Sequence, residues 1–405
     1  MLVRRLLVVV VPVLLAACSA SSGAARPVTP GASSKPAPVL VLPLATSLSE
    51  SGGEWAAVAM GHLGQPDNTF WELFFRPAGG GAWRLVTPPG VADNGGLVVA
   101  SDEAGRVVVG FETSQLLGFS PLASSADDGA SWQAGVLPVP LARTPSAFAL
   151  SPRGPAVALA PAGSGTVETS AAGLSRWTVL GSAATIAASV AGRSCGLTAV
   201  TAVGLSATGA PLVGAACSSQ GDVGVFALEP GRAARRHSRR APARWSLIGP
   251  RLATRAGVTG TEVVSLVRSR AGIAALVAVA YGGRTELVEV HELGETNRWT
   301  VSAPLSVPAG GRVASAGSTA AGGMFVLMAR GSRESIDVTT PSGRGWRPLP
   351  TPPRGTSVVA FGPGGSDDAI VISGSRFVDY RLAPGHRQWS RAQLLAVPIL
   401  YGSSS

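Results

Sequence analysis

The chain has 405 residues, of which only 14% are charged, and it contains 52 glycines and 31 prolines. Its 33 basic and 23 acidic side chains give a formal net charge of +10, but Lys35 is the only lysine. This bias, together with the many Ala, Gly, Pro and Val residues, is typical of a GC-rich genome. No nucleic-acid-binding motif accompanies the charge, so it does not predict a nucleic-acid ligand; it favours contact with anionic surfaces.

The N-terminus has the pattern of an export signal. Arg4 and Arg5 precede an apolar run over residues 6–15, which at about ten residues is half the roughly 20 needed to span a membrane. A charged start and a short apolar run are typical of a secretory signal. The run ends in Leu-Ala-Ala-Cys at 15–18, which resembles the lipobox of bacterial lipoproteins. The resemblance implies cleavage before Cys18 and diacylation of its thiol, which would hold the protein on the outer face of the cell membrane; the alternative is an ordinary signal with an incidental cysteine.

The rest of the chain divides by composition. After a signal peptide at 1–17, residues 18–38 are rich in Ser, Ala, Gly and Pro and lack an apolar period, which predicts a disordered tether behind the lipidated cysteine. As a flexible coil such a tether reaches about 25 Å. We expect a globular part at 39–401 and a short tail at 402–405.

The globular part contains an internal repeat that tryptophans mark. Seven of the nine tryptophans recur at intervals of 43 to 68 residues, the range of a four-stranded propeller blade. They are Trp83, Trp132, Trp177, Trp245, Trp299, Trp346 and Trp389. The unit that ends at Trp177 predicts four short strands, over 147–150, 156–160, 166–169 and 176–180, with turn residues between them. Connections this short predict antiparallel strands.

The repeat sets the fold class. We predict an all-β protein, a β-propeller of seven four-stranded antiparallel blades with almost no helix. A pair of β-sandwiches is the alternative. Residues 397–401 are a candidate for the last strand of the ring, and the sequence does not show how the ring closes.

One turn of the second unit carries a motif. Ser125, Asp127, Gly129 and Trp132 match the pattern S-x-D-x-G-x-x-W and resemble the Asp-box of sialidase-like propellers. Glycine permits a positive φ at a tight turn, the aspartate can accept backbone hydrogen bonds, and the tryptophan would pack between sheets. The other units keep glycine and tryptophan without the aspartate. The resemblance implies a fold and not an activity, because the motif occurs in enzymes, receptors and assembly factors alike.

The cysteine count is consistent with a lipid anchor. If Cys18 carries lipid, Cys195 and Cys217 remain as a pair in an oxidising compartment, where a disulfide is expected. They flank residues 196–216, which predict a hairpin around a turn at 206–209 and would bring the two thiols together. The alternative is two buried free thiols.

We find no catalytic, cofactor or metal site in the sequence. A sialidase would need three arginines, a Tyr–Glu pair and an acid aspartate; the nearest match to its Arg-Ile-Pro motif, at Arg76, lacks the isoleucine and is interpreted as coincidence. The four histidines lack metal-ligand spacing. Turn patterns predict exposed, solvated positions for five acids, namely Asp93, Asp102, Glu103, Asp367 and Asp368.

The densest local charge lies just before Trp245 and lengthens its unit. It consists of Arg232, Arg235, Arg236, Arg239, Arg240 and Arg244. These side chains are candidates for contact with anionic lipid, phosphorylated wall polymer or an acidic partner. The alternative is a solvated insertion.

We therefore expect a monomeric, membrane-tethered binding module that contacts an envelope protein or glycan through its loops. The alternatives are a glycoside hydrolase or lyase of the Asp-box group and a structural accessory of envelope assembly.

Overall fold

The computed structural model places its described residues within one compact unit, Lys35–Ser405. The described residues are 46–48, 53–63, 68–89, 91, 97–102, 105–111, 120–137, 147–151, 156–159, 165–170, 174–219, 221–229, 244–252, 257–269, 272–294, 298–340, 343–362 and 365–399. The predicted lipidation at Cys18, the tether and the tail lie outside these ranges.

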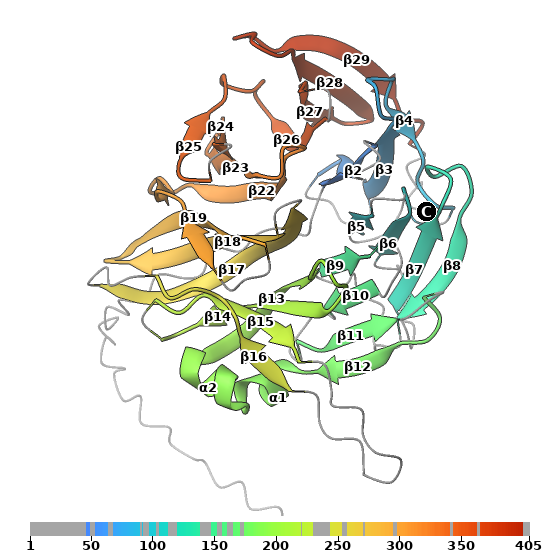
Figure 1. The fold of residues 1–405 in the computed structure, drawn as a ribbon. Helices are drawn as coiled ribbons and strands as arrows, with labels where there is room; N and C mark the ends of the chain where they lie inside the picture. Colours follow the sequence, from blue (N-terminus) through green and yellow to red (C-terminus); the bar gives the residue numbers. More distant parts are fainter. Residues whose placement is uncertain are drawn as a thin grey trace, which may run out of the picture. The chain divides into compact units, whose positions relative to one another are not determined.

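Nearly all of the secondary structure is antiparallel β-strand, as predicted (Figure 1). Five sheets have four strands each, hydrogen-bonded in chain order. They are β1 (Thr46–Leu48), β2 (Glu54–Gly61), β3 (Thr69–Arg76) and β4 (Arg84–Leu85); β5 (Leu97–Ser101), β6 (Val107–Phe111), β7 (Ser120–Ser125) and β8 (Gln133–Leu137); β9 (Ala147–Leu150), β10 (Ala156–Leu159), β11 (Val167–Ser170) and β12 (Thr178–Gly181); β22 (Arg312–Ser318), β23 (Met324–Arg330), β24 (Arg333–Thr339) and β25 (Trp346–Pro348); and β26 (Thr356–Phe361), β27 (Asp367–Ser373), β28 (Arg376–Leu382) and β29 (Ser390–Ala396).

A nine-stranded sheet contains two further four-stranded units. Its strands are β13 (Leu197–Leu205), β14 (Pro211–Cys217), β15 (Gly224–Leu228), β16 (Trp245–Leu247), β17 (Val258–Ser269), β18 (Gly272–Tyr281), β19 (Arg284–Glu292), β20 (Trp299–Val301) and β21 (Leu305–Ser306). The two units join where β14 pairs with β17, at Ala216 with Glu262 and Cys217 with Thr261. Because this pairing merges them, seven remains a prediction for the number of separate blades.

The sheets follow one another around a closed ring. The first strand of each unit contacts the first strand of the next, and β26 of the last sheet contacts β1 and β2 of the first. An apolar cluster fills each interface between successive units. Since neighbours cover both faces of a sheet, its inner strands read as continuous apolar runs, such as Gly272–Tyr281 in β18.

Three tryptophans of the repeat fasten their outer strands to the preceding unit. Trp132 Nε1 donates to the Val86 carbonyl at 3.0 Å. Trp346 and Trp389 donate in the same way to Ala303 at 2.9 Å and to Pro350 at 3.0 Å. Each acceptor follows the outer strand of the unit before. Ring closure repeats this with a different residue, because Gln393 of β29 both accepts from Trp83 N at 2.7 Å and donates to Trp83 O at 2.9 Å.

Two short helices, α1 (Ala183–Ala187) and α2 (Val190–Cys195), precede β13. No helix in the described ranges has the length and apolar character needed to cross a membrane. The predicted disulfide joins Cys195 to Cys217, with Cα atoms 5.3 Å apart, across the predicted β13–β14 hairpin. The candidate last strand at 397–401 is wrong in its described part, since β29 ends at Ala396 and residues 397–399 lie outside any strand.

Candidate functional site

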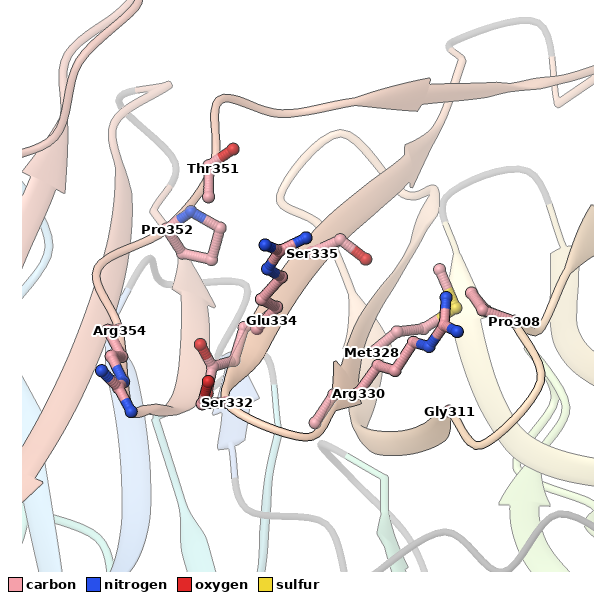
Figure 2. Close-up of a pocket in the computed structure, with 12 residues that line it drawn as sticks. Pro308, Gly311, Met328, Arg330, Ser332, Glu334, Ser335, Thr351, Pro352 and Arg354 are labelled. Carbon is pink, nitrogen blue, oxygen red and sulfur yellow. The ribbon is translucent and has the colours of Figure 1, made fainter.

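A pocket of about 570 Å³ lies beside the β23–β24 turn (Figure 2). Its other walls are two connections between units, at Pro308 and Gly311 before β22 and at Thr351 to Arg354 before β26. In an antiparallel meander, the turns between second and third strands emerge on the same side as these connections. The pocket therefore occupies a face made of turns and linkers, where binding residues on rigid scaffolds are usually placed.

The local sequence presents two arginines at the ends of this turn. Arg330 ends β23 and Arg333 begins β24, and the two residues pair across the hairpin. Gly331, the first of the two turn residues, has a φ of 59°, which glycine adopts without strain. Both arginines are exposed.

The pocket carries more positive than negative charge. Arg330, Arg333 and Arg354 line it, against the single carboxylate of Glu334. In Figure 2, Arg330 and Arg354 lie on opposite sides of Glu334. Within the described ranges, none of the three guanidiniums takes part in an ion pair. Planar guanidinium groups suit bidentate recognition of carboxylate or phosphate, and Met328, Pro308 and Pro352 supply apolar wall.

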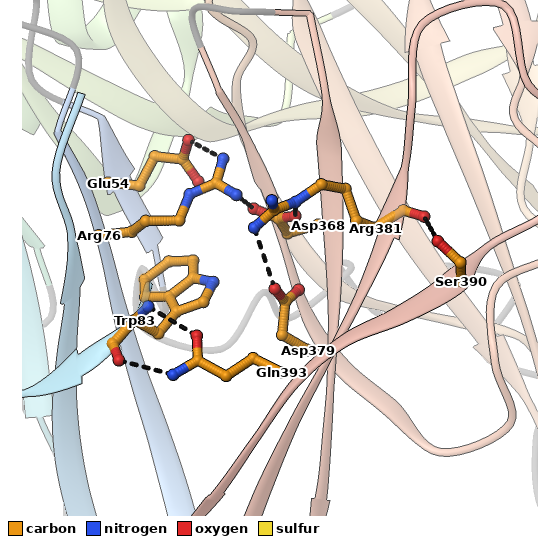
Figure 3. Close-up of polar contacts among 8 residues, drawn as sticks. All are labelled: Glu54, Arg76, Trp83, Asp368, Asp379, Arg381, Ser390 and Gln393. Atoms are coloured by element: carbon orange, nitrogen blue, oxygen red, sulfur yellow. Dashed lines mark hydrogen bonds and ion pairs between the residues drawn. The ribbon is translucent and has the colours of Figure 1, made fainter. Parts of the chain in front are cut away.

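A second charged cluster lies between the first and last sheets (Figure 3). This charged seam consists of Glu54, Arg76, Asp368, Asp379 and Arg381. Arg76 Nη2 lies 2.7 Å from Glu54 Oε1, and Arg76 also pairs with Asp368. Arg381 Nε lies 3.0 Å from Asp368 Oδ1, and Arg381 Nη2 lies 3.3 Å from Asp379 Oδ2.

The seam has the residue types of an active site, but its side chains are not accessible to a substrate. The side chains of Glu54, Arg76, Asp368 and Asp379 are at most 3% exposed, and only that of Arg381 reaches solvent, at 28%. Burial raises the pKa of Glu54 to about 7 against the opposing effect of Arg76. A substrate cannot approach these groups in the closed ring, so the cluster serves as a contact between sheets.

The structure corrects three predictions about acids. Asp367, expected in an exposed turn, is the first residue of β27 and is half-buried. Asp368, expected in an exposed turn, is the second residue of β27 and is fully buried. Asp102 is 4% exposed and binds Arg106 at 3.0 Å. The signal for Asp368 was the apolar run that follows it. Asp379 and Arg381, two residues apart on one strand, share a face, and Arg381 pairs with Asp368 on the neighbouring strand. Nothing local indicated Arg76, the partner of Asp368 from the first sheet. Asp93 and Glu103 lie outside the described ranges.

The Ser125–Trp132 turn is held by its own side chains. Gly129 N donates to Ser125 Oγ at 2.9 Å, and Asp127 Oδ1 accepts from Ser125 Oγ at 2.7 Å and from Ser131 N at 2.9 Å. Hydrogen bonds from Ser131 and then Ser125 lower the pKa of Asp127 to about 2. A Cβ on Gly129 would lie 2.8 Å from Val86 Cβ, so only glycine fits. These contacts organise the turn against the preceding sheet.

The remaining predicted site residues are not brought into the pocket. Arg232 through Arg240 lie outside the described ranges. Arg244 is exposed and lies 3.3 Å from Glu229, so its charge is already paired. Among the described residues, no group of three His, Cys, Asp or Glu side chains is placed to hold a metal ion. The described first strands of the units carry one carboxylate, Glu262.

The sheets and their order define the class: the chain is a β-propeller. No family model and no curated protein matches its sequence. Among solved structures, it is similar to a periplasmic gluconolactonase of Pseudomonas aeruginosa, with 16% identity over 84% of this chain and 95% of that one and a TM-score of 0.51. A putative 6-phosphogluconolactonase from Bacteroides uniformis shows 13% identity, coverage of 86% and 97%, and a TM-score of 0.50.

A prolyl endopeptidase structure matches 85% of this chain at 12% identity, with a TM-score of 0.48. The chain spans about half (49%) of that protein. At these identities the two lactonase-like structures establish the propeller fold and carry nothing about activity.

Proposed function

We propose that this chain is a lipid-anchored propeller of the cell envelope that binds an anionic ligand in the pocket beside the β23–β24 turn, as a binding module without catalysis of its own. The observation that carries the proposal is the unbalanced charge of the pocket, with three exposed arginines against one carboxylate. An exposed guanidinium without an ionic partner is free to bind a ligand anion without first breaking a contact. The apolar wall beside it suits an anion attached to a larger body, such as a sugar.

A hydrolase remains the alternative. Two carboxylates flanking the scissile bond are the usual requirement for glycoside hydrolysis, and the residues around this pocket include only Glu334. The resemblance to structures described as lactonases supplies a fold, and no described residue set adds a catalytic arrangement to it. A binding role therefore needs only the residues that line the pocket, whereas a hydrolase would need a second carboxylate beside Glu334.

The test is anion binding by the full-length protein in detergent micelles. Phosphate and glucuronate are titrated by calorimetry, with glucose as the neutral control. We expect glucuronate to bind and glucose not to, and the triple variant Arg330→Ala/Arg333→Ala/Arg354→Ala to lose binding. The matched control removes the same charge at Arg298, Arg387 and Arg391, which are exposed elsewhere. If both triple variants lost glucuronate binding equally, the loss would reflect net charge alone, and the pocket would be rejected as the binding site.

The lipid anchor has a separate test. Cys18→Ser should move the protein from the detergent phase to the aqueous phase in detergent partitioning, because the acyl chains supply the membrane affinity. Metabolic labelling with palmitate should mark the native chain and not this variant. Labelling of the variant would place the lipid elsewhere.

A further inference from the structure

The last three units share one turn design. The second and third strands are joined by two residues between Tyr281 and Arg284, between Arg330 and Arg333, and between Ser373 and Arg376. The first turn residue is a glycine each time, with φ values of 50°, 59° and 60° at Gly282, Gly331 and Gly374. Each turn therefore places an arginine as the first residue of the third strand.

These arginines form a row across successive units. β18 packs against β23, and β22 against β26, so equivalent turns emerge on the same side as the pocket. Packed sheets lie about 10 Å apart, so the row spans on the order of 20 Å. We call Arg284, Arg333 and Arg376 the arginine arc; Arg333, in the middle, lines the pocket.

The charge of the arc faces solvent. All three side chains are exposed. In the part of the chain that the structure describes, none of them takes part in an ion pair. One carboxylate or phosphate can reach only one arginine at this spacing. A ligand that engages all three must be extended and carry repeated negative charge.

We propose that the pocket and the arginine arc together bind a linear polyanion, an anionic glycan with repeated carboxylate or phosphate groups. The proposal rests on the proposed function and extends it from a single anion to a chain. A flat anionic bilayer fits less well, because the central arginine lines a recess of about 570 Å³ that admits a protruding group.

The test compares chain lengths on the full-length protein. The probes are galacturonate as monomer and octamer, and phosphate as single ion and octamer. With at least one chemistry, the octamer should bind about tenfold or more tightly than the monomer, because linked groups bind with a high effective concentration. Arg284→Ala/Arg376→Ala should abolish that gain and leave monomer binding unchanged. Arg387→Ala/Arg391→Ala is the charge-matched control and should retain the gain.

Each failure has its own meaning. If monomer binds and the octamer gains nothing, the arc is overturned and the pocket stands. If neither monomer nor octamer of either chemistry binds, the proposed function fails as well. Binding to phosphatidylglycerol vesicles that depends on the arc, with no gain for either octamer, would overturn the glycan in favour of a membrane surface.

The charged seam carries a second, independent inference. It contains three carboxyl groups and two guanidiniums, and the carboxyls of Asp368 and Asp379 both contact the guanidinium of Arg381, at 3.0 Å and 3.3 Å. Two buried carboxylates that share one guanidinium repel each other, and a proton on one of them relieves this repulsion. Asp379 Oδ1 is buried without a hydrogen-bond partner among the described residues, so a proton on this oxygen would break no existing contact.

We infer that Asp379 and Asp368 together hold one proton at the interface between the first and last sheets. The charged groups around this pair are Glu54 on β2, Arg76 on β3, Arg381 on β28 and the adjacent Asp367 on β27. With every group ionised, the three seam carboxylates and two arginines would leave one excess negative charge in a buried site, which burial disfavours. The proton removes that charge.

Proton retention makes the seam sensitive to pH. Burial, and then the nearby Asp368, raise the pKa of Asp379 from its ordinary 3.8 to about 7. Between these values the folded protein holds more protons than the unfolded chain. Stability from this group is therefore greatest below pH 4 and is lost as the pH rises through about 7, by up to about tenfold in the unfolding constant per pH unit.

The test is a pair of stability profiles on the full-length protein. Asp379→Asn keeps the size of the side chain and removes its titratable proton. Between pH 4 and 7, the unfolding constant of this variant should therefore change less with pH than that of the native chain, by up to about tenfold per pH unit. Glu229→Gln, at an exposed pair with Arg244, should leave the native profile unchanged. Hydrogen exchange at pH 8 should increase first in β2, β3, β27 and β28. Parallel profiles for the native and Asp379→Asn proteins, or exchange that increases evenly over all sheets, would overturn the inference.

Discussion

The pocket and the charged seam use the same chemistry in opposite settings. Both bring arginines from neighbouring strands and connections close to carboxyl groups. In the seam, four of five side chains are at most 3% exposed and every guanidinium has a carboxylate partner. In the pocket, the arginines are exposed and outnumber the carboxylate. Paired and buried charge holds the ring together, whereas unpaired and exposed charge is available to a ligand.

The largest expected effect is in the seam. Asp368 accepts from both Arg76 and Arg381, so Asp368→Asn removes the charge that joins the two arginines, while Arg76 keeps Glu54 and Arg381 keeps Asp379 as partners. Removing one partner of a buried pair costs about 3–5 kcal/mol, and the two remaining pairs hold the loss near the lower end of this range. Chemical denaturation of the full-length protein at pH 7 measures this loss. A change below about 1 kcal/mol would mean that the seam is dispensable and that the comparison with the pocket fails.

A smaller loss is expected from the neighbouring glycine. A Cβ at Gly362 would lie 2.8 Å from Arg76 Nη2 and would also collide with the Glu54 carboxylate. Both side-chain ends are fixed by their ion pair and cannot turn aside. Gly362→Ala should therefore lower the unfolding free energy by about 1–3 kcal/mol, as overpacking does. Gly345→Ala, where nothing lies within 4 Å of the added methyl, is the matched control.

The two regions also differ in how far sequence predicts them. The tryptophan repeat and the turn residues predicted the sheets, and the cysteine count predicted the Cys195–Cys217 bridge, because these signals are local or countable. The seam was missed because Arg76 meets Asp368 only when the ring closes. The pocket was missed because its residues come from one turn and two linkers that are separated in the chain, although the Gly-x-Arg pattern of the turn recurs at Gly282 and Gly374. Asp368 was wrongly placed because a pair of acids beside glycines reads as a turn, while β27 begins at Asp367.

The pocket arginines should separate stability from binding. Arg330→Ala/Arg333→Ala/Arg354→Ala removes exposed groups that form no ion pair with described residues, so each substitution should change the unfolding free energy by no more than about 0.5 kcal/mol. Denaturation and glucuronate titration are measured on the same preparation. A loss of several kcal/mol would show that these arginines also support the fold and would erase the contrast with the seam.

The smallest effect concerns the one acid in the pocket. Glu334 opposes an incoming anion, so Glu334→Gln should tighten glucuronate binding without removing any arginine. Interactions between exposed charges are worth about 0.2–1 kcal/mol, which corresponds to a gain of up to about fivefold, and it should shrink as salt screens the charges. Asp128→Asn, in the distant turn of the second unit, is the control and should leave binding unchanged. Weaker binding in Glu334→Gln would instead identify Glu334 as a hydrogen-bond acceptor for a ligand hydroxyl, and the pocket would then match its ligand by more than charge.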